Sequence, residues 1–454
     1  MKNSTRIITT LALIATLCSC SLFKTAQKDE TPAAAKETAK ELWTENTSRS
    51  VATNVRYEID LDTLTGNGYT FELPESMNAD IDSMLNSWQA RNMLHNFDGK
   101  GTENETVQFS DTMYAKRLAA LPTIVRMPYN NMVRSCIDRY TKKGRSQVSY
   151  LLGISEYYFP IIEEEIDRIG VPRELKYLPI IESALNPKAT SRAGAKGLWQ
   201  FMFHTGKLYG LKANNYIDER FDPTKATAAA LHYLKDLYDM FQNWELAIAA
   251  YNCGPGNVKK AILRSGGSTD FWKIYPWLPR ETRGYLPGFI AASYIMTYYE
   301  DHGICPMKPE LPMAIDTIHV NKNLHFNQIV EVCGTDIQEL RALNPQFLKD
   351  IIPGENETYV LRLTNNTITR FVENEDSIYK HNADKYFPKA NIEKMLKEAK
   401  ENNGAGNMIR HKIKNGETLG SIAIKYRVSV KQIMKWNNLK NSNIRAGKYL
   451  KIYK

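Results

Sequence analysis

Helical patterning over a long stretch, from about residue 111 to 300, most constrains the fold of this chain. Apolar residues recur there at helical spacing and few strand signals interrupt them, which predicts an α-rich domain. One helix is expected to run from Pro172 to Leu185, because proline suits a first helical turn and Pro187 follows the last apolar position. Further helices are expected at 223–237, 244–251 and 288–299.

Two weakly similar segments follow this region, at residues 317–363 and 409–453. Each has the pattern of a short strand, two short helices and a second strand, with Asp336 and Ser429 at matching positions suited to helix N-caps. The charged and then Gly/Asn-rich stretch 390–406 between them predicts a helix that runs into a linker. The sequence therefore predicts two small α+β domains after the helical one.

The N-terminus has the pattern of a secretion signal. Lys2 and Arg6 precede the apolar run 7–17, which is too short to span a bilayer. The run ends in Leu-Cys-Ser-Cys20, which resembles the bacterial lipobox and implies cleavage before Cys20 and lipidation of that residue. An ordinary signal peptide cut nearby is the alternative. Further expectations are a tether at 21–50 and an accessory region at 51–110, with a strand at 57–61 and a helix at 80–94.

The composition bounds the number of domains and the kinds of partner. With 454 residues the chain is too long for one core, so several domains are expected. A net charge of +9 favours an anionic partner such as nucleic acid, a membrane surface or an acidic glycan, and a mildly basic protein without a polyanion is the alternative. The four cysteines outside the signal lack metal-ligand spacing, so no metal is expected. Cys305 and Cys333 either form a disulfide or remain free thiols.

Glu182 is the candidate catalytic residue. It lies near the C-terminal end of an expected helix among apolar neighbours, where burial and the helix dipole both disfavour its ionised form. A raised pKa is what a general acid requires at neutral pH. From residue 183 to 217 the chain has no aspartate or glutamate, which predicts a basic wall beside a lone carboxylate. The cations of that stretch are Lys188, Arg192, Lys196, Lys207 and Lys212.

Two glycine-containing segments are the candidate glycan contacts. Residues 194–202 combine small residues, which permit close backbone approach, with an aromatic ring and the amide of Gln200. Tyr251 and Asn252 close a helix before a Gly-Pro-Gly turn, where a hydroxyl and an amide would orient the carboxyl group and a substrate. Each segment also has a structural interpretation, as a glycine turn before a buried helix and as a core tyrosine with a helix cap.

Four segments with these residues occur in a fixed order between about residues 110 and 300. They are Glu182-Ser183, Gly-Leu-Trp-Gln-Phe-Met at 197–202, Ala-Tyr-Asn-x-Gly at 250–254 and Pro-x-Glu-Thr-Arg-x-Tyr at 279–285. Together they resemble the lytic transglycosylase family of the lysozyme-like superfamily, and in particular its membrane-bound type D members. The resemblance implies an α-rich lysozyme-like catalytic domain (SLT, similar to goose-type lysozyme) at 111–305.

The resemblance implies non-hydrolytic cleavage of the MurNAc–GlcNAc β-1,4 bond by a carbon-oxygen lyase that needs no cofactor. Glu182 would protonate the leaving oxygen and then take the proton from the C6 hydroxyl, which closes on C1 as 1,6-anhydroMurNAc. Ordinary glycoside hydrolysis uses two carboxylates, so a lone one fits this scheme. The residues implied to contact glycan or to line the cleft are Ser183, Gly197, Gln200, Phe201, Met202, Tyr251, Asn252 and Tyr285.

The last part of the chain resembles a LysM peptidoglycan-binding module, through Asn-Gly-Glu-Thr-Leu at 415–419 and the helices that follow. This module is expected at 408–454, after a linker at 364–407. The copy at 317–363 lacks the opening, which implies a degenerate LysM-like domain, and the sequence leaves open whether this domain binds glycan. With a lipidated Cys20, the chain is expected on the periplasmic face of the cell envelope, in the outer membrane or else the inner, with peptidoglycan rather than nucleic acid as its partner.

Two other functions are open at this point. A muramidase that admits water, as goose-type lysozymes do, would have a similar cleft and differ only in its product. A non-catalytic cell-wall tether would bind through the C-terminal module, but the intact set Glu182, Gln200 and Tyr251 argues against it. The sequence leaves open the oligomeric state, endo versus exo cleavage and the preferred stem peptides.

Overall fold

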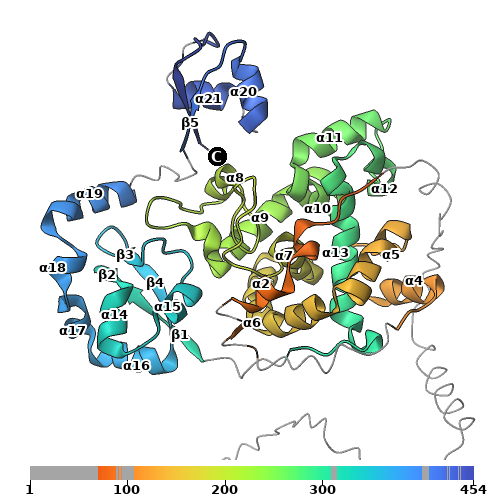
Figure 1. Ribbon diagram of the computed structural model, residues 1–454. Coiled ribbons are helices and arrows are strands. Elements are labelled where there is room, and N and C mark those ends of the chain that lie inside the picture. The colour runs from red at the N-terminus through yellow and green to blue at the C-terminus, as the bar shows by residue number, and fades with distance from the viewer. Residues whose placement is uncertain are drawn as a thin grey trace, which may run out of the picture. The chain divides into compact units, whose positions relative to one another are not determined.

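The computed structural model describes most of the chain after residue 69 (Figure 1). The described residues are 70–87, 90, 91, 94, 107–307, 314–400, 408–426, 428, 430–437, 439 and 441–453. The expected signal peptide with Cys20, the tether, the strand at 57–61 and the N-cap Ser429 lie outside the described residues.

Helices make up most of the chain from residue 107 to 307, as the patterning predicted. Short polar side chains begin several of them, because a side-chain oxygen can accept from the unpaired N–H groups of a first turn. Asp222 accepts from the N–H groups of Thr224 and Lys225, and Asn243 begins the next helix in the same way. The helices are α4 (Asp111–Ala120), α5 (Asn131–Asp138), α6 (Arg145–Ile169), α7 (Leu178–Ser183), α8 (Phe203–Leu208), α9 (Pro223–Phe241), α10 (Trp244–Cys253), α11 (Pro255–Arg264), α12 (Phe271–Ile274) and α13 (Arg280–Tyr298). Shorter turns are η3 (Arg139–Lys143), η4 (Arg173–Tyr177), η5 (Glu219–Phe221), η6 (Tyr275–Trp277) and η7 (Glu300–His302).

Helix α10 lies at the centre of this domain's core. Residues 246–250 are fully buried, and α9, α11 and α13 pack against the helix. A helix that is apolar on every side is stable only where other elements cover it on every side. The last turn of α10 therefore holds Tyr251 and Asn252 on a rigid element.

Two helices differ from expectation. The single helix expected from 172 to 185 is instead η4 followed by α7, because Pro179 in the first turn of α7 has no N–H to continue the hydrogen-bond ladder. Ala184 and Leu185 then end α7 with φ values of 51° and 58°. Helix α13 begins at Arg280 rather than at 288, and Pro287 lies inside it.

The two segments after the helical domain have the predicted strand–helix–helix–strand order. In the first, a small core that includes Val320, Phe326 and Leu361 lies beneath two antiparallel strand pairs, β1 with β4 and β2 with β3. Asp336 caps its second helix, as predicted. Its elements are β1 (Ile315–Val320), β2 (Asn323–His325), α14 (Phe326–Cys333), α15 (Ile337–Leu343), β3 (Ile351–Pro353) and β4 (Tyr359–Thr364). Four helices follow where a linker was expected at 364–407, and this expectation was wrong for 365–400 because apolar side chains such as Phe371 and Ile378 join the domain core. They are α16 (Asn365–Glu373), α17 (Glu375–Lys380), α18 (Ala383–Tyr386) and α19 (Lys389–Lys400).

The C-terminal module has a separate core that includes Leu419, Ile422, Ile433 and Ile452. Its elements are β5 (Met408–Lys412), α20 (Leu419–Tyr426), α21 (Val430–Trp436) and β6 (Tyr449–Tyr453). Strands β5 and β6 pair antiparallel. The module thus repeats the order of the first segment on a smaller scale.

The loop at residues 211–218 of the helical domain is joined to the β1–β4 domain by backbone hydrogen bonds. The N–H of Asp218 donates to the carbonyl of Gln346 at 2.9 Å, and the N–H of Leu348 donates to the carbonyl of Tyr216 at 2.7 Å. Ile217 joins the core of the β1–β4 domain. The loop is therefore shared between two hydrophobic cores.

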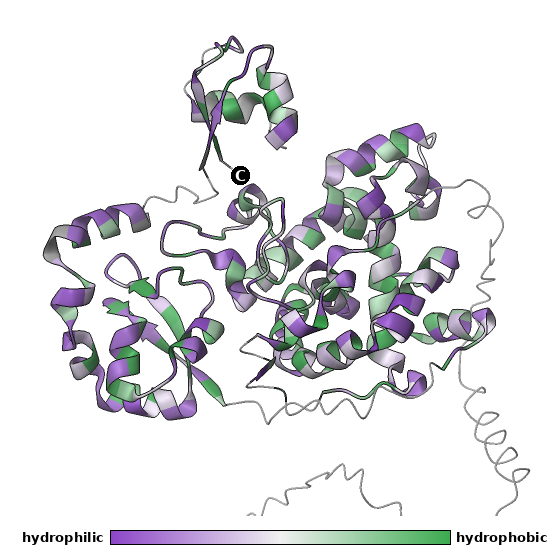
Figure 2. Ribbon diagram, viewed as in Figure 1, coloured by the Kyte–Doolittle hydropathy of each residue, from purple (hydrophilic) through white to green (hydrophobic). Residues whose placement is uncertain are grey.

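Hydrophobic and hydrophilic residues alternate around most of the helices (Figure 2). Within the described residues, no helix is long and apolar enough to cross a membrane. Cys305 is exposed and Cys333 is buried, and each is a free thiol, so the alternative of a disulfide between them is not realised.

Candidate active site

Glu182 lies at the end of the short helix α7, as predicted. The carbonyl groups of a last helical turn have no partner within the helix. Here the N–H groups of Ala184 and Leu185 turn back to the carbonyls of Ile180 and Pro179, at 3.0 and 3.2 Å. The left-handed backbone at residues 184 and 185 therefore ends the helix at Ser183, one residue after Glu182.

Tyr285 is the direct partner of the Glu182 carboxyl group. Its hydroxyl, on helix α13, donates to Oε1 of Glu182, and α13 packs against α7. Burial raises the pKa of Glu182 to about 7, although the Tyr285 bond lowers it. No other carboxylate of the described residues contributes to this shift. Among the described residues, Glu182 thus has no carboxylate partner, and its carboxyl group is partly protonated at neutral pH.

Tyr251 lies close enough to Glu182 to be affected by its charge. Burial, and next the charge of Glu182, raise the pKa of Tyr251 well above its usual value. The same two causes raise the pKa of Tyr285 well above its usual value. Both phenols therefore stay neutral and can act only as hydrogen-bond donors or acceptors beside the carboxyl group.

The segment 194–202 forms a tight loop that contacts the end of helix α7, which carries Glu182. The backbones of Lys196 and Phe201 pair in both directions, at 3.0 and 3.1 Å. Gly197 has a φ of 82°, and a Cβ at that position would lie 1.7 Å from the carbonyl oxygen of Arg220, so only glycine fits. Gln200 has a φ of 47°, and its amide donates to the carbonyl of Gly197 at 2.8 Å.

Three side chains anchor the loop to the elements of the site. The Ser183 hydroxyl donates to the carbonyl of Leu198 at 2.9 Å, and the Tyr251 hydroxyl donates to the carbonyl of Trp199 at 2.8 Å. The buried indole N–H of Trp199 donates to Oγ1 of Thr227 on α9 at 2.9 Å. Ser183 is buried beside the acid, so its predicted substrate contact stays a prediction while its loop contact is direct.

A buried ion pair, which sequence reasoning missed, holds both ends of the same loop. The guanidinium of Arg220 pairs with Asp218 at 2.7 Å and also donates to the carbonyls of Gly194 and Phe201, each at 3.3 Å. Both charged side chains are 2% exposed. The signal was the absence of acids before residue 218, which makes Asp218 the first carboxylate available to the loop's cations.

The remaining predicted residues differ in their access to solvent. Met202 is 37% exposed and Phe201 is buried. Asn252 is exposed, and its Oδ1 accepts from the Thr282 hydroxyl at 2.7 Å, which ties α10 to α13. Roles in binding glycan stay predictions for these residues.

The expected basic wall is only partly free. Lys196 pairs with Asp218 at 3.1 Å, and Lys212 pairs with Glu357 in the β1–β4 domain. Lys188 is exposed at the surface, and partial desolvation of its ammonium, with the charge of Arg341 as the next cause, lowers its pKa. Two of the five cations therefore serve structural ion pairs, which the local sequence did not indicate because both carboxylates come from later segments.

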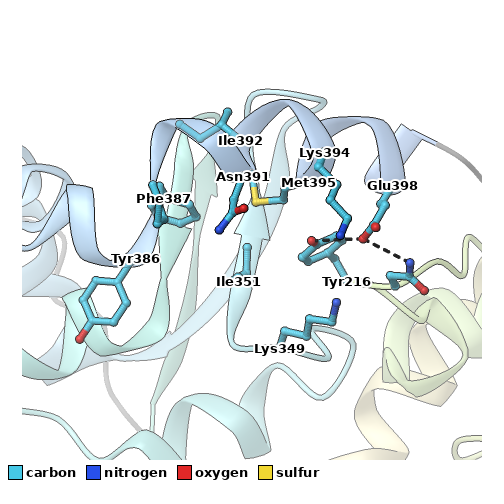
Figure 3. A pocket seen from close by; sticks show the side chains of 12 residues that line it. Tyr216, Lys349, Ile351, Tyr386, Phe387, Asn391, Ile392, Lys394, Met395 and Glu398 are labelled. Carbon is cyan, nitrogen blue, oxygen red and sulfur yellow. Dashed lines mark hydrogen bonds between the residues drawn. The ribbon is translucent and has the colours of Figure 1, made fainter.

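A cavity of about 530 Å³ lies between the loop at Tyr216 and the helices α18 and α19. Figure 3 shows Lys349, Tyr386, Asn391 and Met395 around it. The Lys349 ammonium lies 4.3 Å from the ring centroid of Tyr216. Glu182 does not line this cavity, so it belongs to the junction with the β1–β4 domain and not to the candidate active site.

Three protein families match successive parts of the chain. The Transglycosylase SLT domain matches residues 159–274, which include Glu182, the loop and Tyr251. The LysM-like domain of lytic transglycosylase MltD matches residues 314–380, and the LysM domain matches residues 411–452. The expected class, an α-rich SLT domain of the lysozyme-like type with small α+β LysM modules, is confirmed.

Individual relatives agree with these matches. The soluble lytic murein transglycosylase of Escherichia coli (strain K12) is 34% identical over 124 residues, which cover 26% of this chain and 19% of that protein. The crystal structure of the 70 kDa soluble lytic transglycosylase from Escherichia coli is 25% identical, covers 38% of this chain and 31% of its own, and has a TM-score of 0.29. Membrane-bound lytic murein transglycosylase D of Escherichia coli (strain K12) is 30% identical over 336 residues, 72% of this chain and 70% of that protein. The chain belongs to the family of lytic murein transglycosylase D.

Proposed function

We propose that this protein is a peptidoglycan lytic transglycosylase that cleaves the MurNAc–GlcNAc β-1,4 bond and leaves 1,6-anhydroMurNAc ends. The observation that carries the proposal is the single half-buried carboxyl group of Glu182, whose pKa is raised to about 7 and whose partner is a neutral tyrosine. A hydrolase of the common type would require a second carboxylate to activate water or attack the sugar.

The reaction proceeds in two proton transfers through the same group. In the first, the protonated Glu182 gives its proton to the glycosidic oxygen, and the bond from that oxygen to C1 of MurNAc breaks. The N-acetyl oxygen of the substrate stabilises the positive charge at C1. In the second, the Glu182 carboxylate takes the proton of the C6 hydroxyl, and O6 bonds to C1. No water is consumed, and the enzyme returns to its starting protonation state.

Tyr285 acts on the state between the two transfers. Its hydroxyl donates to the carboxylate that the first transfer leaves, because it is already directed at Oε1 of Glu182. The loop 197–202 offers backbone groups and the Met202 side chain to the glycan, with Ser183 and Tyr251 holding the loop's position. Tyr251 and Asn252 then orient the sugar next to the acid.

We further propose that the chain is a lipoprotein held at Cys20, on the periplasmic side of the outer membrane, as the lipobox resemblance implies. The relative from Escherichia coli is described as membrane-bound. The domain limits 111–305 for catalysis, 317–363 for the LysM-like domain and 408–454 for the LysM domain belong to the same proposal. Deletion of 408–454 should weaken binding to sacculi, measured by co-sedimentation, and unchanged binding would contradict this assignment.

The reaction is tested by a digest of purified peptidoglycan with the lipid-free protein, resolved by mass spectrometry. Muropeptides lighter by one water than their reducing-end counterparts are expected, since ring closure replaces hydrolysis. Reducing-end products would identify a muramidase instead. Glu182→Gln should lower turnover roughly hundredfold or more, because the amide keeps the shape of the side chain but is not an acid at neutral pH. No product from the wild-type chain, with an active control enzyme on the same sacculi, would refute the catalytic proposal.

A further inference from the structure

A hydrogen bond from far upstream caps the helix that carries Glu182. The hydroxyl of Ser76 donates to the carbonyl of Ile181 at 2.6 Å, across 105 residues. The neighbouring carbonyls of Pro179 and Ile180 are already used by the turn after α7, so Ser76 meets a group that would otherwise be an unpaired helix end. The capped peptide is the one directly before the catalytic residue.

The backbone of Ser76 is itself held in place by a side chain of helix α6. The Gln147 amide on α6 donates to the carbonyl of Ser76 at 2.6 Å, and both side chains are buried. Met77 is fully buried in the core of the catalytic domain. The short turn that contains these residues, η2 (Glu75–Asn78), is therefore anchored to the domain on two sides.

The same segment lies against the helix that carries Tyr285. The N–H of Glu72 donates to the carbonyl of Arg280 at 3.2 Å. A Cβ at Gly284 would lie 1.9 Å from the Glu72 carbonyl oxygen, and one at Gly288 would lie 3.0 Å from the Pro74 ring. Two glycines one helical turn apart thus leave a shallow face on α13 that the segment fills.

We propose that residues 71–77 form a catalytic strap, and that Ser76 is a positioning residue which sets the Glu182 carboxyl group against Tyr285. The inference rests on the proposed role of Glu182 as the acid. The strap touches the residue before Glu182 on α7 and the residue before Tyr285 on α13. It therefore fixes the spacing of the two elements whose side chains share the catalytic hydrogen bond.

The test compares Ser76→Ala with Ser155→Ala in the full lipid-free chain. Ser155 is a matched control because it is a buried serine that donates to a backbone carbonyl, of Leu152 at 2.7 Å, within helix α6. Each variant loses one buried hydrogen bond, and Ser76→Ala should lose more stability in urea unfolding because it leaves the Ile181 carbonyl without a partner, so kcat is compared under conditions where both variants are fully folded. Only Ser76→Ala should lower kcat, by roughly tenfold, the rate equivalent of one such bond. Its KM should stay close to wild type, because the Ser76 side chain is buried and bonds the protein backbone rather than the substrate.

Two further readouts separate positioning from a general loss of structure. Ser76→Ala should move the basic limb of the kcat pH profile to higher pH. A misplaced Glu182 loses part of the Tyr285 hydrogen bond that favours its carboxylate, so its pKa rises. Gly288→Ala, which displaces the strap at Pro74 and Met77 without changing Ser76, should lower kcat in the same direction.

The proposal would be overturned if Ser76→Ala and Gly288→Ala both kept the wild-type kcat and pH profile while hydrogen exchange showed that residues 71–77 had loosened. An equal kcat loss in Ser155→Ala would also overturn it, because the effect would then be one of stability. The product is measured in every case. Reducing-end products from the wild-type chain would refute the transglycosylase assignment, while the kcat comparison would still decide the role of the strap.

Discussion

Replacing Glu182 by glutamine should stabilise this protein at alkaline pH while it lowers turnover. The pKa of the Glu182 carboxyl group is about 7 in the folded chain, against a usual value of 4.5. Below pH 4.5 the group is neutral in both states and has no effect on the free energy of unfolding. As the pH rises through 4.5 toward 7, the unfolded chain releases the proton and the folded chain keeps it, so stability falls. Above pH 7 the accumulated loss is about 3 kcal/mol, which glutamine avoids.

Urea unfolding of the wild-type chain and Glu182→Gln at pH 4 and at pH 8 measures this difference. Hydrogen exchange in α10 and α13 reports the unfolding of the catalytic domain separately from the modules. The two proteins should be about equally stable at pH 4, and the variant should be more stable by about 3 kcal/mol at pH 8. Glu156→Gln, at an exposed position inside α6, is the control and should follow the wild type. A difference between wild type and Glu182→Gln that is the same at both pH values would refute the raised pKa of the Glu182 carboxyl group.

Three further changes test other contacts of the site. Tyr285→Phe removes the donor that lowers the pKa of Glu182, so the basic limb of the kcat/KM profile should move up by about one to two pH units. Gly197→Ala should cost at least about 1 kcal/mol in thermal unfolding and most of the turnover, because it adds a Cβ 1.7 Å from a backbone oxygen at a φ of 82°. Arg362→Met removes the pair with Asp222 at 3.1 Å and should destabilise the junction by about 2 kcal/mol, seen as faster hydrogen exchange in β4.

The local features of the catalytic helices could be predicted from the sequence. Asp222 before Pro223 marks the start of α9, because a short acid accepts from the first N–H groups and proline tolerates the first turn. Glu182 near a helix end follows from apolar periodicity that stops before Pro187. These signals work because they depend on neighbours within one or two turns of the chain.

The contacts that complete the site could not be predicted, because they join distant segments. Tyr285 lies 103 residues from Glu182, and the sequence indicated only that it lines the cleft. The strap at residues 71–77 lies in a region whose sequence pattern is mixed, so its role could not be predicted. Only the structure explains why α13 has a glycine at position 284, because a Cβ there would collide with the backbone of the strap. The break of one expected helix at Pro179 had a local signal, which the strong apolar periodicity on both sides outweighed.

The neutral surroundings of Glu182 explain how one carboxyl group could serve the proposed reaction as an acid and then as a base. A cationic partner would lower its pKa and leave little of the acid at neutral pH, whereas burial without a partner would make the proton hard to release. Tyr285 donates to the carboxylate and stays neutral itself, because burial and the charge of Glu182 raise the pKa of this phenol well above its usual value. Since the proton that leaves in the first transfer returns in the second, the enzyme needs a pKa at which neither transfer is strongly unfavourable. A half-buried carboxyl group with a phenol as its donor provides this, and among the described residues no other charged group contributes to the pKa of Glu182.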